Sequence, residues 1–155
     1  MAKYTLPEFI RHIDLVIEKL EDELPNTFFE VWAKDMISRI TYRVGTEGKS
    51  AKGGKFSPYD PKYLKWKQKK KGFKQTDKNF TLTTDMWDRF GITNTSKTPG
   101  FLEVTLAGTN SFAQDKMNWN SEREGISVID ASKEDREAQD AFLQKWLNEF
   151  LSKEL

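Results

Sequence analysis

The sequence predicts a single α+β domain over residues 1–155, in which two N-terminal helices and one C-terminal helix pack on a small, mostly antiparallel sheet. Near both ends of the chain, apolar residues recur every three or four positions, as in helices that bury one face. Residues 92–95 and 101–106 instead alternate apolar and polar side chains, which is typical of paired strands. Aromatic residues make up 13% of the chain, so a core can form although the mean hydropathy is only -0.73.

The first helix is predicted over residues 6–24. Thr5 and Glu8 form a capping box, in which each side chain can bond the backbone N–H of the other residue. A continuous apolar stripe follows, and Pro25 ends the helix because the residue before a proline avoids helical backbone angles. From this helix we expect Phe9, Ile13 and Ile17 to enter the core.

A second helix is predicted over residues 27–40, where Thr27 and Glu30 form another capping box. Residues 41–44 are mostly β-branched or aromatic, so we expect the chain to leave the helix there as a strand. The expected sheet comprises residues 41–44, 80–82, 92–95 and 101–106, with 126–129 as a candidate fifth strand.

A glycine-rich and lysine-rich loop follows at residues 45–57, and we expect it to be mobile and to become ordered on a neighbouring subunit. The chain then starts a short helix, with Asp60 as its cap and Pro61 in its first turn. Tyr63 and Trp66 are three residues apart, so we expect them to share a buried face of this helix.

Two short helical turns are predicted at residues 84–90 and 113–117. The last helix starts at Ser132, which forms a variant capping box with Asp135. The other residues that we expect in the core are Phe28, Trp32, Met36, Trp87, Phe90, Leu102, Val104, Phe142, Trp146 and Phe150.

The net charge of +1 conceals three blocks of different sign. Residues 1–42 carry 5 basic and 8 acidic side chains, residues 43–78 carry 12 and 3, and residues 79–155 carry 8 and 13. A basic centre between acidic flanks can bind a polyanion. It can equally pair with an acidic surface on another copy of the chain or on a partner protein.

The sequence offers no catalytic set, and we expect no enzyme activity, no cofactor and no metal. The chain has no cysteine and a single histidine, His12, which excludes disulfides, thiolate chemistry and a multi-histidine metal site. The acidic pairs Asp85/Asp88 and Glu134/Asp135 lie at predicted helix starts, where the helix dipole favours them. No apolar run is long enough to span a membrane, and the N-terminus is unlike a signal peptide.

A nonspecific nucleic-acid-binding module is the alternative function. The basic segment from Lys65 to Lys71 could neutralise phosphates, and Tyr59, Tyr63 and Trp66 could stack on bases. Helical spacing favours burial of these aromatic residues, and the segment lacks the arginines that usually read base edges. The sequence therefore predicts at most nonspecific contact with nucleic acid.

The order of features over residues 29–150 resembles the phage virion-morphogenesis and tail-completion proteins, which act at the head–tail joint. In order, these features are the helix ending in Ile37-Ser38-Arg39-Ile40-Thr41, the glycine-rich loop with Phe56-Ser57-Pro58-Tyr59, the run Tyr63-Leu64-Lys65-Trp66-Lys67 before a basic stretch and Gly72, the element over 80–86, a short hairpin, and a terminal helix starting at 132–135. Asp85 stands where the family usually has glycine.

The resemblance implies a structural protein of a tailed-phage virion, assembled in the host cytoplasm. It would form or cap an oligomeric ring at the neck or at the end of the tail, with itself and other neck or tail-tube proteins as partners. Heterologous contacts between copies of a small domain close into such rings when the rotation fits. The residues that we expect at the assembly interface are Lys49, Lys52, Lys55, Phe56, Tyr59, Lys67, Lys69, Lys70 and Lys71.

Overall fold

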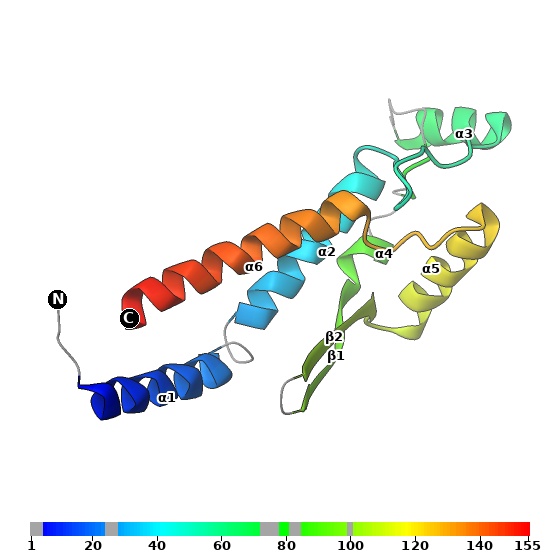
Figure 1. Cartoon of the computed structure of the whole chain (residues 1–155). Helices are drawn as coiled ribbons and strands as arrows, with labels where there is room; N and C mark the ends of the chain where they lie inside the picture. The colour runs from blue at the N-terminus through cyan, green and yellow to red at the C-terminus, as the bar shows by residue number, and fades with distance from the viewer. Residues whose placement is uncertain (1–4, 24–27, 72–77, 81–84, 99–100) are drawn as a thin grey trace.

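The computed structural model describes residues 5–23, 28–71, 78–80, 85–98 and 101–155. This part of the chain is α+β, as predicted, with six helices and one two-stranded antiparallel sheet (Figure 1). In chain order the elements are α1 (Leu6–Glu23), α2 (Phe29–Gly45), α3 (Pro61–Lys71), α4 (Asp85–Asp88), β1 (Phe90–Thr98), β2 (Phe101–Gly108), α5 (Ser111–Glu124) and α6 (Lys133–Glu154).

Helices α2 and α6 lie side by side and antiparallel along the length of the molecule (Figure 1). At one end of the pair, the Phe28 ring lies 5.7 Å from the Phe142 ring and 4.5 Å from the Trp146 ring, between centroids. At the other end, Arg43 of α2 binds Asp135 of α6. Aromatic packing and a buried ion pair therefore hold the two ends of this helix pair.

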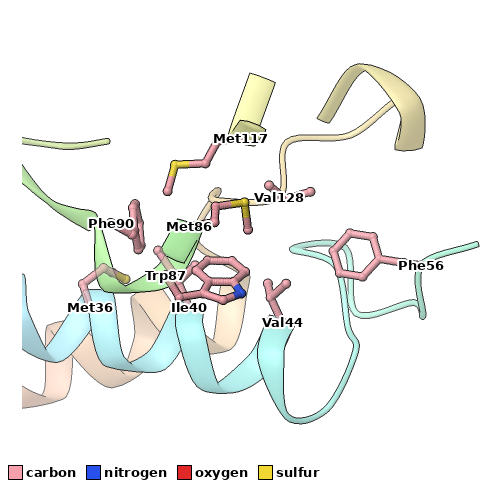
Figure 2. Close-up of a cluster of buried hydrophobic side chains, with 9 residues drawn as sticks. All are labelled: Met36, Ile40, Val44, Phe56, Met86, Trp87, Phe90, Met117 and Val128. Atoms are coloured by element: carbon pink, nitrogen blue, oxygen red, sulfur yellow. The ribbon is translucent and has the colours of Figure 1, made fainter. Parts of the chain in front are cut away.

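The main core lies on the side of α2 away from α6, where α2 packs against α4, β1 and α5 (Figure 2). Met36, Ile40 and Val44 recur every four residues on one face of α2, which the packing of a helix requires. The complete cluster consists of Met36, Ile40, Val44, Phe56, Met86, Trp87, Phe90, Met117 and Val128.

Most of the predicted core residues outside α1 are at least partly buried, whereas two of the three predicted for α1 are exposed. Phe28, Met36, Trp87, Phe90 and Phe150 are buried, as predicted. Trp32, Val104, Phe142 and Trp146 are half-buried, and the side chain of Leu102 lies outside the described residues.

The prediction that the α1 stripe enters the core was wrong for two of its three residues. Phe9 and Ile17 are 46% and 49% exposed, Ile13 is half-buried, and Val16 is buried instead. The helix itself forms over the predicted residues, but it lies along the edge of the molecule near the end of α6 (Figure 1). Most of its apolar face therefore remains uncovered.

The hairpin of β1 and β2 is confirmed, and it is longer than predicted. Phe90 pairs with Gly108 at its base and Thr98 pairs with Phe101 at its far end. The register shifts between Ile92 and Asn94, where a bulge bends the first strand.

The other predicted strands do not form in the part of the chain that the structure describes. Residues 41–44 continue α2, because Ile40 and Val44 bury on the same helical face and Arg43 reaches α6. Residues 126–129 are irregular, since the N–H of Val128 bonds the Ser121 hydroxyl instead of a strand. Phe80 is not in a strand, and residues 81–82 lie outside the described residues.

The loop at 45–57, which we expected to be mobile, forms a turn that has backbone hydrogen bonds of its own. Lys49 and Lys55 form an isolated antiparallel bridge, and the N–H of Phe56 bonds the Gly48 carbonyl oxygen at 3.2 Å. Gly48 and Gly53 have φ of 66° and 82°, a backbone conformation that glycine adopts without steric strain. These two glycines therefore shape a turn here.

Candidate functional site

A cleft of about 400 Å³ lies between α3 and α5 and is the candidate functional site. Its walls combine aromatic rings with cations, a pairing typical of sites for ligands that are both flat and anionic. The aromatic residues are Tyr59, Tyr63, Phe80 and Trp119, the cations are Lys78, Lys116 and Arg123, and Asp60, Met86 and Asn120 complete the lining.

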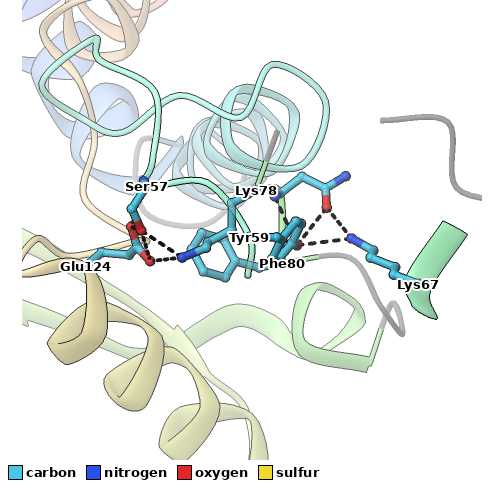
Figure 3. Close-up of polar contacts among 7 residues, drawn as sticks. Ser57, Tyr59, Lys67, Lys78, Phe80 and Glu124 are labelled. Atoms are coloured by element: carbon cyan, nitrogen blue, oxygen red, sulfur yellow. Dashed lines mark hydrogen bonds and ion pairs between the residues drawn. The ribbon is translucent and has the colours of Figure 1, made fainter. Parts of the chain in front are cut away.

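Tyr59 joins the basic helix α3 to the segment at 78–80 (Figure 3). Its hydroxyl group accepts hydrogen bonds from the Lys67 ammonium at 3.0 Å and from the Phe80 N–H at 3.2 Å. Lys67, which is only 1% exposed, also donates to the Asn79 side-chain oxygen at 3.0 Å, and its ammonium lies 4.4 Å from the centre of the Tyr59 ring. This lysine therefore fixes the position of α3.

Lys78 and Glu124 form a buried ion pair beside the cleft (Figure 3). Each side chain is 3% exposed, and the Glu124 carboxylate also accepts hydrogen bonds from the N–H and hydroxyl group of Ser57. Burial opposes ionisation of Glu124, but the hydrogen bonds from Lys78 and Ser57 keep its pKa below the ordinary value. The pair connects α5 to two segments that precede α4.

On the α3 side of the cleft, Asp60 caps the start of the helix and three aromatic rings lie in a row. The Asp60 carboxylate accepts the N–H groups of Lys62 and Tyr63 at 2.9 and 3.2 Å, as predicted for a cap. The Tyr63 ring lies 5.3 Å from the Tyr59 ring and 5.6 Å from the Trp66 ring, between centroids. Burial raises the pKa of Tyr63, so its hydroxyl group stays neutral.

Helix α5 exposes two aromatic residues, of which Trp119 lines the cleft, and a cation lies over each ring. The Arg123 guanidinium lies 4.8 Å from the centre of the Trp119 ring, and the Lys116 ammonium lies 4.1 Å from that of Phe112. Trp119 is 56% exposed and Phe112 is 54% exposed. Large exposed rings of this kind mark binding surfaces on folded proteins.

Phe80 has a strained backbone within this cleft. Its φ is 55°, which a residue with a bulky side chain rarely adopts, and its ring packs edge-on against Phe56 at 4.9 Å between centroids. Strained residues of this kind concentrate at functional sites, where surrounding contacts hold them in place.

The structure separates the residues predicted for an assembly interface. Phe56, Tyr59 and Lys67 are buried, so they support the surface from beneath. Lys69 and Lys70 are exposed on α3, and the side chain of Lys71 lies outside the described residues.

The predicted lysines of the loop differ among themselves in exposure. Lys52 and Lys55 are exposed, whereas Lys49 is half-buried and its ammonium lies 3.2 Å from the Glu47 carboxylate. Trp66, which we expected to be buried, is 44% exposed.

The residues of the second wall were missed because α5 was predicted only as a turn. Its sequence has no apolar stripe, and only Ala113 and Met117 are buried. The ends of the helix carry readable signals: Asn110 accepts the Ala113 N–H, and Gly125 follows the last turn with φ of 65°. A cap followed fifteen residues later by glycine would have identified this helix.

The described residues contain no group of three or more histidine, cysteine, aspartate or glutamate side chains arranged to hold a metal ion. His12 lies far from the cleft along the chain, on α1, where its Nε2 is 2.7 Å from the Glu154 carbonyl oxygen. Asp135 belongs to the ion pair with Arg43. Over the ranges that the structure describes, no helix has both the length and the apolar character of a membrane span.

Comparison with known proteins found no matching family model, no matching curated protein and no matching solved structure.

Proposed function

We propose that this chain is a structural subunit of a tailed-phage virion, and that it forms a tail-completion or neck ring at the head–tail joint or tail end. The location in a virion rests on the resemblance over residues 29–150, and ring formation rests on one structural observation: helices of opposite charge lie at opposite ends of the molecule. In Figure 1, α1 and α3 occupy the two extremes, so that α1 of one copy can reach α3 of the next. Head-to-tail contacts of this kind are heterologous, and they close into rings when the rotation fits.

The two helices have complementary charge. Helix α1 carries six acidic and two basic residues, whereas α3 carries six lysines and no acidic residue. Asp14 and Glu18 are exposed on α1, and Lys65 and Lys69 are exposed on α3. Attraction between surfaces of opposite charge directs encounter and fixes the register of an interface.

The uncovered apolar face of α1 supports the same role. Leu6, Phe9, Ile10 and Ile17 are between 46% and 72% exposed, although the helix is amphipathic. Contiguous apolar surface of this kind marks a site of protein association. Trp66, 44% exposed on α3, gives the opposite end an aromatic residue of the type that dominates interface energies.

Charge reversal at either end should weaken self-association at least about tenfold, because it places like charges in the interface. The variants are Asp14→Lys/Glu18→Lys on α1 and Lys65→Glu/Lys69→Glu on α3. Each variant alone should stay monomeric by mass photometry at concentrations where the wild type associates. An equal mixture of the two should associate again, since each reversed helix then meets an opposite charge on the other variant.

The matched control is Glu137→Lys/Asp140→Lys, which reverses two exposed charges on α6 between the two ends. This control should associate like the wild type. A wild type that stays monomeric at every concentration, or a mixture that does not restore association, would contradict pairing of α1 with α3.

The virion role has a separate test. Tailed particles purified from the phage whose genome encodes this chain should contain the protein, detected by peptide mass spectrometry. Particles that lack it, while the protein is abundant in the infected cell, would exclude a structural role in the virion. Self-association would then not support a place at the head–tail joint or tail end.

A further inference from the structure

We propose that the cleft between α3 and α5 binds a nucleotide of a single-stranded nucleic acid, with the base among the aromatic rings and the phosphates on the surrounding cations. The inference goes beyond the assembly role, because it assigns a ligand to the residues of α5. It also differs from simple attraction to a lysine cluster, since it requires particular aromatic side chains.

Three rings in and just before α3 form a row of tilted neighbours. Tyr59, Tyr63 and Trp66 follow one another with centroids 5.3 and 5.6 Å apart, and Trp66 at the end is 44% exposed. Trp119 lines the cleft from α5 and is 56% exposed. Every base has a flat face, so exposed rings bind single strands with little regard to sequence.

The cations of the cleft differ in how firmly they are bound within the protein. Lys78 is held by Glu124 in a buried pair, so it contributes structure more than ligand contact. Arg123 instead lies over the exposed ring of Trp119 in the cleft, and Lys116, which also lines the cleft, lies over Phe112, which does not. The Arg123 charge therefore lies next to the ring on which a base would stack, and Lys116 adds a second cation to the cleft.

The basic surface continues beyond the cleft along α3. Lys62, Lys65, Lys69 and Lys70 are exposed, and no carboxylate among the described residues forms an ion pair with them. Asp60, the carboxylate that lines the cleft, uses one oxygen to accept two N–H groups of α3. A strand that leaves the cleft along α3 would therefore meet a lysine near successive phosphates.

These features favour a single strand over a duplex or an acidic peptide. A base can enter a cleft of about 400 Å³ only when it is unpaired. An acidic peptide would use the lysines, but it would leave the exposed faces of Trp66 and Trp119 without flat partners. The combination of rings and cations matches the stacking surfaces and charged grooves of proteins that bind single strands.

The test uses the full chain and a fluorescein-labelled oligothymidine of about 12 nucleotides, a length within the range that single-strand-binding domains cover. We expect binding by fluorescence anisotropy, quenching of tryptophan emission, and an affinity that falls steeply between about 50 and about 200 mM salt. Trp119→Ala should weaken binding about fivefold or more, and Trp119→Phe should retain most of the affinity because the ring remains.

The matched control for the aromatic residue is Tyr42→Ala, which removes a ring that is 60% exposed on α2 and does not line the cleft. Arg123→Ala should weaken binding and reduce the salt dependence, whereas Lys133→Ala, at an exposed position on α6, should do neither. All four positions are exposed, so circular dichroism should show these variants folded like the wild type.

Three results would overturn the proposal. The first is no binding of the oligothymidine at about 50 mM salt, where electrostatic contacts are strong. The second is equal affinity of the wild type and Trp119→Ala, which would indicate attraction to lysines alone. The third is a poly-glutamate peptide that binds more tightly than the oligonucleotide with the same dependence on Trp119, which would identify an acidic peptide as the occupant. The strand shares Lys65, Lys69 and Trp66 with the proposed contact between α1 and α3, so binding is measured at concentrations at which mass photometry shows a monomer.

Discussion

Replacing Arg43 with alanine should lower the free energy of unfolding by about 3–5 kcal/mol, the usual loss when one member of a buried ion pair is removed. The Arg43 guanidinium donates to the Asp135 carboxylate at 2.9 Å, to the Lys49 carbonyl oxygen at 2.9 Å and to the Asp130 carbonyl oxygen at 2.6 Å. Its removal would leave a carboxylate that is 9% exposed without its cation. Urea denaturation followed by circular dichroism measures the difference.

The stability difference between wild type and Arg43→Ala should depend on pH. Burial opposes ionisation of Asp135, but hydrogen bonds from the Ser132 N–H and from Arg43 hold its pKa below the ordinary value. The stabilisation is therefore complete above the unfolded pKa of about 3.9 and is lost as the pH falls through the lower pKa of the folded chain. The difference should shrink as the pH falls below about 4, leaving the part that comes from the hydrogen bonds to the Lys49 and Asp130 carbonyl oxygens.

Lys34→Ala is the control for this prediction, because Lys34 and Glu30 form an ion pair on the exposed surface of the same helix. Its unfolding free energy should stay close to that of the wild type, since exposed pairs add little stability. An Arg43→Ala variant that is as stable as this control at neutral pH would contradict the structural role of Arg43.

Replacing Glu124 with alanine should also lower the free energy of unfolding by about 3–5 kcal/mol. The ammonium group of Lys78, 3% exposed, would lose its counterion, and Ser57 would lose the acceptor of its N–H and hydroxyl group. Urea denaturation is again the measurement. Lys78 also lines the cleft, so this variant tests stability and not the assignment of a ligand.

The double variant Lys78→Met/Glu124→Leu distinguishes two causes of lost stability, a buried charge without a partner and the loss of side-chain contacts. It should be more stable than either Lys78→Met or Glu124→Leu alone, because no charge is left buried without a partner. Single losses that simply add in the double variant would show that the two side chains are not coupled, and would contradict the ion pair.

Local signals in the sequence predicted the starts of α3 and α6 and the hairpin of β1 and β2. Ser132 and Asp135 make both hydrogen bonds of the predicted capping box at the start of α6. Asp60 caps α3 as expected, and the alternating residues around the hairpin pair in an antiparallel register. These features depend on residues within a few positions of one another, so a reading along the chain captures them.

The predictions that failed concern residues whose structure or burial depends on contacts with residues far away in the sequence. Residues 41–44 have strand propensity, yet Arg43 and Val44 extend α2 because their side chains find partners in other segments. Propensity for strands is weak compared with burial and pairing of this kind. The interface prediction included Lys67 because it belongs to a basic run, but the ring of Tyr59 and the oxygen of Asn79 enclose its charge.

By itself, the sequence determined the fold class, the starts of α3 and α6, and the separation of charge into a basic centre and two acidic flanks. Only the tertiary structure decided which side chains of those segments face solvent. Packing left the apolar stripe of α1 uncovered, buried Lys67, and brought Trp119 and Arg123 of α5 to a cleft with Tyr63 of α3. The physical reason is that burial depends on contacts between residues far apart in the chain, and no local pattern specifies those contacts.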